Sequence, residues 1–121
     1  MALSNMFVAG HTPIDGVARA FALAAAGTVT IPKGACVKFI HLRNKTANAV
    51  TGGIKIGTTA AGTDVVAAAA LAANAIVSVV PIAAGAGFVN TAAARVLYVE
   101  AVTAFNAATV DVAVEYTELV K

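Results

Sequence analysis

Two glycines and an aspartate in the segment 51–66, TGGIKIGTTAAGTDVV, are the first residues whose types and spacing suggest chemistry. Gly57 and Gly62 have the spacing of a phosphate-binding loop, in which backbone N–H groups cradle phosphate and a lysine follows the second glycine. Here Thr63 and Asp64 follow Gly62. A carboxylate in place of the ammonium group would repel a phosphate, and a strand-like pair of valines follows where a helix should begin. The segment therefore predicts the turn of a β-hairpin rather than a nucleotide site.

The histidines and serines do not form a catalytic or metal-binding pattern in the sequence. His11 and His41 are the only histidines, and neither has a carboxylate at metal-ligand spacing. Ser4 and Ser78 are the only serines, and neither lies in the G-x-S-x-G pattern of a nucleophile elbow. Because His41 lies in an alternating segment, we expect a half-buried or interface histidine.

The six carboxylates lie mostly at predicted strand faces or turn edges. Asp111, Glu115 and Glu118 belong to the most regularly amphipathic segment, where a solvated strand face accounts for them. The single cysteine, Cys36, excludes an internal disulfide and a cysteine-based metal cage, and its apolar neighbours predict a small buried residue. We therefore predict no enzymatic activity, no cofactor and no metal site.

The composition predicts a protein that works in an assembly. The chain has 121 residues, which suits one domain. Hydrophobic residues make up 60% of it and charged residues only 12%, against a usual charged share of about 25%. So few charges cannot cover the surface of a small protein, and extended apolar surface usually marks an interface. We expect a homo-oligomer, a trimer before a dimer.

The charges and the start of the chain exclude other classes. The net charge is +2 and the lysines and arginines are scattered, which argues against a nucleic-acid partner. The first residues lack the basic and continuous apolar regions of a signal peptide. The segment 65–89 carries no charge and could be a membrane span, but Asn74, Pro81 and two glycines interrupt it, and part of it alternates like a strand. We therefore expect no membrane association.

The elements that must position these residues are short strands. The patterns predict strands over 17–23, 28–32, 36–44, 53–58, 63–67, 75–81, 95–102 and 109–119. About eight short strands, separated by Gly, Pro, Asn and Thr, predict an all-β fold, a small jelly roll or a related antiparallel β-sandwich. In the last strand, Val110, Val112, Val114 and Tyr116 are predicted to point inward, while Asp111 and Glu115 face water. This assignment of residues to the two faces of the strand assumes strict alternation.

Two segments also fit a helix. The segment 14–26 has helix-capping residues, yet its alternation favours a strand, and 67–74 suits one or two helical turns as well as a strand. Before 14, the residues 1–13 have no assignable strand pairing. We therefore divide the chain into an N-terminal arm, 1–13, and a single β-sandwich domain, 14–121.

The alternation of the segment 36–44 and the positions of the aromatic residues predict the core and the contacts. One face of this strand should hold Lys38, Ile40 and Leu42, and the other Val37, Phe39, His41 and Arg43. We expect Phe21, Phe39 and Tyr98 in the core. The large apolar residues in predicted loops or in the arm are candidate partner contacts. These candidates are Met6, Phe7, Phe88 and Phe105.

Three stretches resemble a known family: TVTIPKGA (28–35), TANAVTGGIKIGTTAAGTDVVAAAALAANAIVSV (46–79) and LYVEAVTAFNAATVDVAVEY (97–116). They look like small virion structural proteins of tailed bacteriophages, the head decoration or cement proteins and the head-fibre proteins. The resemblance covers most of the chain from 27 to 116. It implies a jelly-roll or related sandwich fold, a homotrimer or dimer on the capsid surface, the major capsid protein as a partner, and a place in the virion after synthesis in the host cytoplasm.

Three classes of function remain open. The first is a non-enzymatic protein that decorates or cements a phage capsid by bridging major capsid protein subunits. The second is a head-fibre or tail-associated base or adhesin module. The third is a small membrane protein that spans 65–89.

Overall fold

The computed structural model of the protein describes residues 15–82 and 93–118, which form strands joined by turns. The strands are β2 (Asp15–Leu23), β3 (Gly27–Ile31), β4 (Ala35–Asn44), β5 (Ile54–Gly57), β6 (Val66–Ala69), β7 (Ile76–Val79), β8 (Arg95–Ala101) and β9 (Val110–Glu118). The prediction of an all-β fold of about eight short strands is confirmed.

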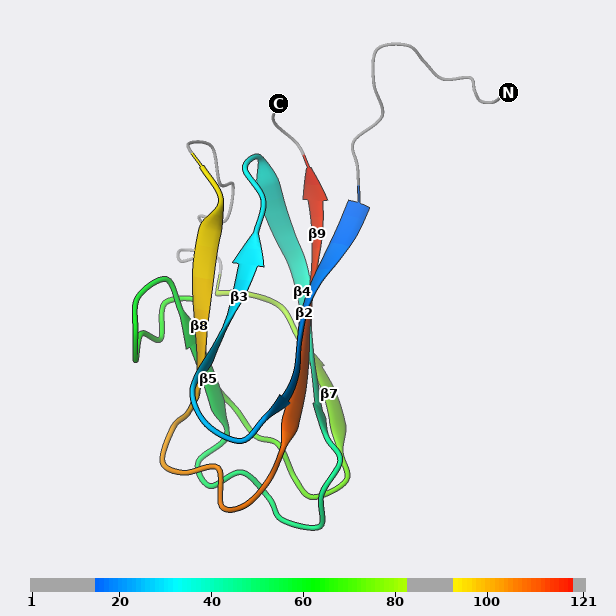
Figure 1. Cartoon of the computed structure of the whole chain (residues 1–121), viewed down its shortest axis with the longest axis vertical. Coiled ribbons are helices and arrows are strands. Elements are labelled where there is room, and N and C mark those ends of the chain that lie inside the picture. Colours follow the sequence, from blue (N-terminus) through cyan, green and yellow to red (C-terminus); the bar gives the residue numbers. More distant parts are fainter. Residues whose placement is uncertain (1–14, 83–92, 119–121) are drawn as a thin grey trace, which may run out of the picture.

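Two four-stranded antiparallel sheets pack face to face, in the orders β2-β9-β4-β7 and β3-β8-β5-β6 (Figure 1). The hydrogen-bonded pairs are nested along the chain: β2 with β9, β3 with β8, β4 with β7, and β5 with β6. The chain therefore runs as one long hairpin of paired strands that is wrapped across two sheets. This is the topology of a jelly roll.

Alternating valines, isoleucines and leucines fill the space between the sheets. In β9, Val110, Val112 and Val114 are buried and the residues between them are half-buried, as the alternation predicts. Tyr116 is partly buried against the same core. The largest fully buried side chains come from both sheets and one connecting loop: Ile31, Ile40, Leu42, Ile54, Ile56, Leu71 and Leu97.

A β-bulge in β4 changes which side chains of this strand face the core. Val37 pairs with Tyr116 and Phe39 pairs with Glu115, so Lys38 is an extra residue in β4. As a result Val37 is buried with Ile40, while Lys38 is half-buried with the outward residues. The prediction that Lys38 shares a face with Ile40, and Val37 with Phe39, is wrong for Lys38 and Val37, because strict alternation does not allow for the bulge.

A second bulge shapes β2. Ala20 pairs with Val112 and Leu23 with Val110, so Phe21 and Ala22 together stand opposite one residue of β9. The bulge returns Leu23 to the core and leaves Phe21 67% exposed.

The aromatic residues predicted for the core lie outside it. Phe21 and Phe39 are exposed, the latter by 44%. Tyr98 is half-buried between the inward residues Leu97 and Val99 of β8. The prediction is wrong for all three, because each follows the outward phase of its strand.

Two segments fit either a helix or a strand in the sequence, and the structure shows which of these their described residues form. The segment 14–26 contains β2, as the alternation favours, and 67–74 contains the end of β6 and a turn at Asn74, which has a positive φ of 53°. Between 65 and 82 the structure has strands β6 and β7 in place of a helical span. Among the described residues, none belongs to a helix long and apolar enough to cross a membrane.

Candidate functional site

The glycine-rich segment forms the connection between β5 and β6, which pair antiparallel, so the predicted hairpin is confirmed. The carboxylate of Asp64 accepts hydrogen bonds from the Thr58 amide at 2.8 Å and from the Thr58 hydroxyl at 2.6 Å. These bonds, the hydroxyl first, hold the pKa of Asp64 below its usual value. A side chain at Gly57 would overlap the Gly62 backbone, so the glycine is needed for the close approach. Asp64 thus occupies the amide and the hydroxyl group of Thr58 at the start of this loop.

Two further predicted residues can be placed directly. Phe105, a candidate partner contact, is partly buried and packs against the core. Cys36 is a free cysteine and is half-buried rather than fully buried. Met6, Phe7 and Phe88 lie outside the described residues, and so does the arm 1–13. The contacts expected of these residues stay predictions.

Polar, charged and large apolar side chains gather on the outward side of the sheet β2-β9-β4-β7, which we call the outer face. Its cross-strand rows follow from the register. One row runs from Arg19 through Ala113 and His41 to Ser78. The outer face is defined by these four residues together with their outward neighbours on the same strands: Val17, Phe21, Lys38, Phe39, Arg43, Ile76, Asp111 and Glu115.

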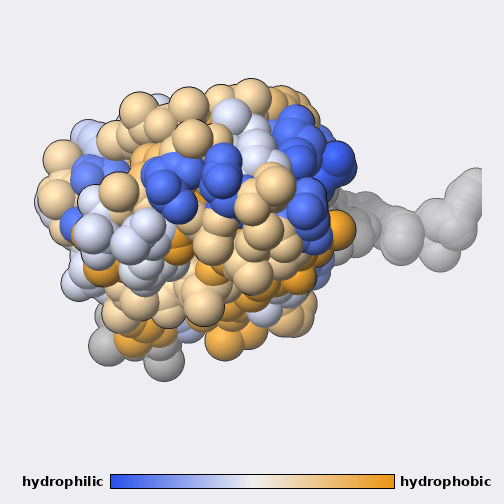
Figure 2. Space-filling model, turned by 90° about the horizontal axis from the view of Figure 1, so that it is seen from below, coloured by the Kyte–Doolittle hydropathy of each residue, from blue (hydrophilic) through white to orange (hydrophobic). Residues whose placement is uncertain are grey.

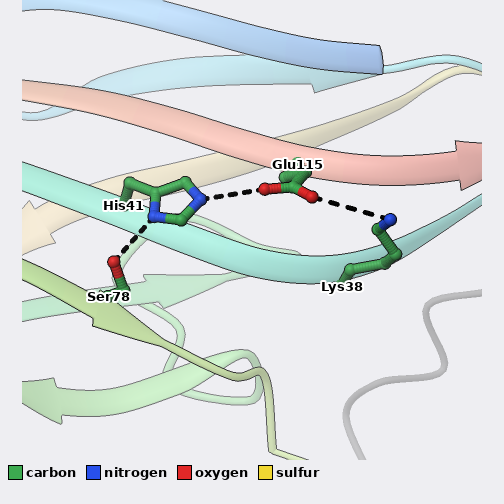
Figure 3. Close-up of polar contacts among 4 residues, drawn as sticks. All are labelled: Lys38, His41, Ser78 and Glu115. Carbon is green, nitrogen blue, oxygen red and sulfur yellow. Dashed lines mark hydrogen bonds and ion pairs between the residues drawn. The ribbon is translucent and has the colours of Figure 1, made fainter. Parts of the chain in front are cut away.

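A polar network crosses three strands of the outer face (Figure 3). His41 Nδ1 lies 2.7 Å from Ser78 Oγ, and His41 Nε2 lies 3.1 Å from Glu115 Oε1. Lys38 Nζ lies 3.6 Å from Glu115 Oε2. With the proton on Nε2, the imidazole donates to Glu115 and accepts from the Ser78 hydroxyl. The half-buried histidine predicted for position 41 is confirmed.

Serine, histidine and a carboxylate in a hydrogen-bonded chain are also the parts of a nucleophilic triad. In the α/β-hydrolases, for example, the serine stands on a sharp turn that exposes its hydroxyl to the substrate. Ser78 instead lies inside β7, directly opposite His41. The network therefore fits a polar cross-strand link better than a nucleophile. The absence of enzymatic activity stays a prediction.

The hydrogen bond from His41 is the main cause that lowers the pKa of Glu115, with Lys38 adding to it. Glu115 is thus ionised over the neutral range and binds a donor with each of its oxygens. Sequence spacing cannot show this site, because His41 and Glu115 are 74 residues apart. The available signal was that both residues are in the outward phase of their strands, but only the strand order makes them neighbours.

The other carboxylate of the outer face is also engaged. Asp111 accepts a hydrogen bond from the Ala22 amide at 2.8 Å and pairs with Lys45 at 3.2 Å. Burial raises the pKa of Asp111, but the bonds from Ala22 and Lys45 outweigh it, so this pKa lies below its usual value. Within 15–82 and 93–118, Arg19 and Arg43 form no ion pair. Arg43 nevertheless lies opposite Asp111 in the strand pairing, and its charge helps to lower the pKa of Asp111. The outer face therefore carries two arginines that form no ion pair with these residues.

A hollow of about 190 Å³ lies between these two arginines. Ala113 lies in its lining, and Phe21 and Ile76 border it from the two edge strands. Because Ala113 has only a methyl group between Arg19 and His41, it leaves the space open. Asp111 and His41 also line the hollow. The hollow thus combines an apolar lining with two arginines and one carboxylate, which Lys45 already binds.

The end of the sandwich where the β2–β3 and β8–β9 connections lie has another character. Figure 2 looks at this end and shows mostly tan, weakly hydrophobic atoms with separate blue groups. A hollow of about 430 Å³ here is lined mainly by alanines, with Phe105 and Asn106 among them. Small side chains offer few anchors, so this end does not have the chemistry of the outer face.

A buried amide, which the sequence analysis did not single out, supports one end of the outer face. Asn44 is 1% exposed and donates to the carbonyls of Asn48 at 2.6 Å and Ala72 at 3.1 Å. Its Oδ1 accepts from the amide and the hydroxyl of Thr46, at 2.9 and 2.7 Å. The signal was an asparagine at the end of a strand with a threonine two residues later, which is typical of an Asx-turn.

The comparisons with known proteins bear on the fold. No family model matches the chain, and no curated protein matches it. Among solved structures, the chain is similar to a chain of the cyanophage Pam1 capsid asymmetric unit, with 19% sequence identity and a TM-score of 0.50. The similarity covers 97% of this chain and 96% of that chain. The two proteins therefore share one fold over nearly their whole length.

Proposed function

We propose that the protein is a non-enzymatic structural component of a bacteriophage virion. The observation that carries the proposal is the similarity in fold, over 97% of this chain, to a chain of a cyanophage capsid asymmetric unit. The family resemblance of the stretches 28–35, 46–79 and 97–116 supports it independently. So does the low charge content of 12%, which is typical of a protein that lives in contact with others.

Within the virion, we propose that the protein decorates or cements the capsid by bridging major capsid protein subunits. This role requires contact surface rather than a catalytic pocket. The outer face supplies such surface, because it presents large apolar side chains beside charges that are mostly paired. Aromatic residues and arginines are also the residues that dominate binding energy at interfaces.

The test is the amount of this chain in purified particles. Virions of the phage that encodes it are purified on a density gradient, and the ratio of this chain to the major capsid protein is measured by quantitative mass spectrometry. A fixed ratio that corresponds to every capsomer is expected. A few copies per particle would instead indicate the fibre or tail module, and absence from particles would overturn the virion role.

We further propose self-association on the capsid, as a trimer before a dimer. Light scattering of the purified chain at micromolar concentration measures this. A particle of three chains is expected, because the apolar surface of a single chain is large for its charge. A stable single chain at this concentration would contradict the proposal.

A further inference from the structure

The hollow on the outer face, of about 190 Å³, is large enough to receive one apolar side chain. It spans the sheet between Phe21, which is 67% exposed on β2, and Ile76, which is 73% exposed on β7. Covering large apolar side chains with this exposure is favourable, because it removes apolar area from water. Ala113 leaves the centre of the lining open between them.

The carboxylates around the hollow are bound to partners, whereas its two arginines form no ion pair within the described part of the chain. Glu115 is engaged by His41 and Lys38, and Asp111 by Lys45 and the Ala22 amide. Covering these groups costs less than covering an unpaired charge, because their partners come with them. Arg19 and Arg43 are different, since neither forms an ion pair with a described carboxylate, although Arg43 lies opposite Asp111 and acts on it at longer range. A covering surface must supply acceptors for two guanidinium groups.

A second copy of this chain is poorly suited to supply them. Among the described side-chain carboxylates, Asp64 is held by Thr58 and Glu100 by the Ala61 amide. Asp111 and Glu115 are held within the outer face itself, which leaves Glu118. Two outer faces set against each other would also bring four arginines together without new acceptors, and like charges repel.

We infer that the outer face binds another protein through a segment in which an apolar side chain lies between two carboxylates. The apolar side chain fills the hollow over Ala113, and the carboxylates pair with Arg19 and Arg43. The inference rests on the proposed function, because it gives the chemistry of the capsid surface that the protein would contact. The argument from charge and exposure nevertheless applies to the isolated chain.

The first test uses the full chain labelled with nitrogen-15 and three capped peptides. The probe has the sequence Gly-Glu-Phe-Glu-Gly, and its controls replace phenylalanine by alanine or both glutamates by lysine. Saturable shifts are expected at the amides of Phe21, Arg43, Ile76 and Ala113 with the probe. Binding of each control should be at least about tenfold weaker. Equal shifts with all three peptides, or shifts elsewhere on the surface, would overturn the inference.

Variants of the protein test the same contact from the other side. Ala113→Leu fills the hollow, and the double variant Arg19→Gln/Arg43→Gln removes both charges. Each should weaken binding of the probe at least about tenfold while the dispersion of the spectrum shows an intact fold. The matched control, Lys33→Gln/Lys55→Gln, removes two cations elsewhere and should bind like the parent. Unchanged binding by folded outer-face variants would overturn the inference.

Capsid attachment separates this inference from the proposed function. If the parent chain binds capsids and Arg19→Gln/Arg43→Gln binds them equally well, the inference fails and the function stands. If the parent chain is absent from virions, the function fails and the peptide experiment still decides the chemistry of the outer face.

Two other occupants are tested directly. Amide shifts on dilution that map to Phe21 and Ile76 would show a second copy on the outer face, and they would overturn the inference. Pelleting of the chain with vesicles of phosphatidylcholine and phosphatidylglycerol, abolished by Arg19→Gln/Arg43→Gln, would show a lipid surface instead and would also overturn it.

Discussion

The two sheets of the sandwich have similar inner faces and different outer faces. Both inner faces are built from buried isoleucine, leucine and valine. Outside, the sheet β2-β9-β4-β7 presents Phe21, Phe39 and Ile76, whereas the outward rows of β3-β8-β5-β6 pair Thr30 with Val96. Val96 is only 36% exposed. This difference between the outer faces supports the proposed contact with a partner through the sheet β2-β9-β4-β7.

The largest expected effect separates the two sides of a single strand. Ile40 is fully buried in β4, and its neighbour Phe39 is outward. Ile40→Ala should lower the free energy of unfolding by about 2–5 kcal/mol, because it removes buried methyl groups and leaves a cavity. Phe39→Ala, the control, should cost less than about 1.5 kcal/mol, and both are measured by urea denaturation. Equal losses would show that the outer face contributes to folding and not only to contact.

A smaller effect is expected where β4 ends. Asn44→Ala removes the acceptor of the Thr46 amide and both donors to the loop carbonyls. Because buried partners lose their hydrogen bonds, the free energy of unfolding should fall by about 1–3 kcal/mol. The control is Asn48→Ala, which changes an exposed asparagine of the following turn and keeps the backbone carbonyl that accepts from Asn44. A similar loss for both variants, measured by urea denaturation, would contradict a structural role specific to Asn44.

Acid should lower the free energy of unfolding, because three carboxylates become protonated. The pKa values of Asp64, Asp111 and Glu115 all lie below their usual values in the folded protein. The unfolded chain therefore binds more protons at acid pH, and stability rises with pH until it is complete above the unfolded pKa values, at about pH 5.5. It is lost as pH falls through the folded values. Melting temperatures between pH 2 and 7 measure this dependence.

Two variants divide this acid effect between the sheets. Asp64→Asn removes the part that belongs to the β5–β6 turn, and Glu115→Gln removes part of the outer-face contribution. Each should flatten the acid slope. A slope that neither variant changes would show that other groups cause the loss of stability in acid.

The smallest expected effect concerns chemistry at Ser78 and at the glycine-rich turn. Because Ser78 lies inside a strand, the parent chain should hydrolyse p-nitrophenyl acetate no faster than Ser78→Ala. Because Asp64 already binds the Thr58 amide and hydroxyl and its carboxylate would repel phosphate, ATP with magnesium should not raise the melting temperature. A rate lost in Ser78→Ala, or a shift lost in Asp64→Asn, would assign chemistry to these residues.

Local pattern was enough to predict the strands and the class of fold. The alternation of Val110, Val112 and Val114 with polar residues reports burial on one side, and this holds wherever a strand packs on a core. The turn at Gly57 and Gly62 followed from residue types alone, because Asp64 is incompatible with phosphate. These features depend on residues close together in the chain.

The tertiary structure decided what the pattern could not contain. The bulges in β2 and β4 depend on the partner strand, and because of the bulge in β4 alternation misplaced Val37 and Lys38. Phe21 and Phe39, expected in the core because they are aromatic, lie outward for the same kind of reason: the strand's phase, and not the residue type, sets the face. The outer face itself joins β2, β9, β4 and β7. Its network and its hollow exist only because long-range pairing brings distant outward residues into the same rows, and a single sequence does not encode that register in any local signal.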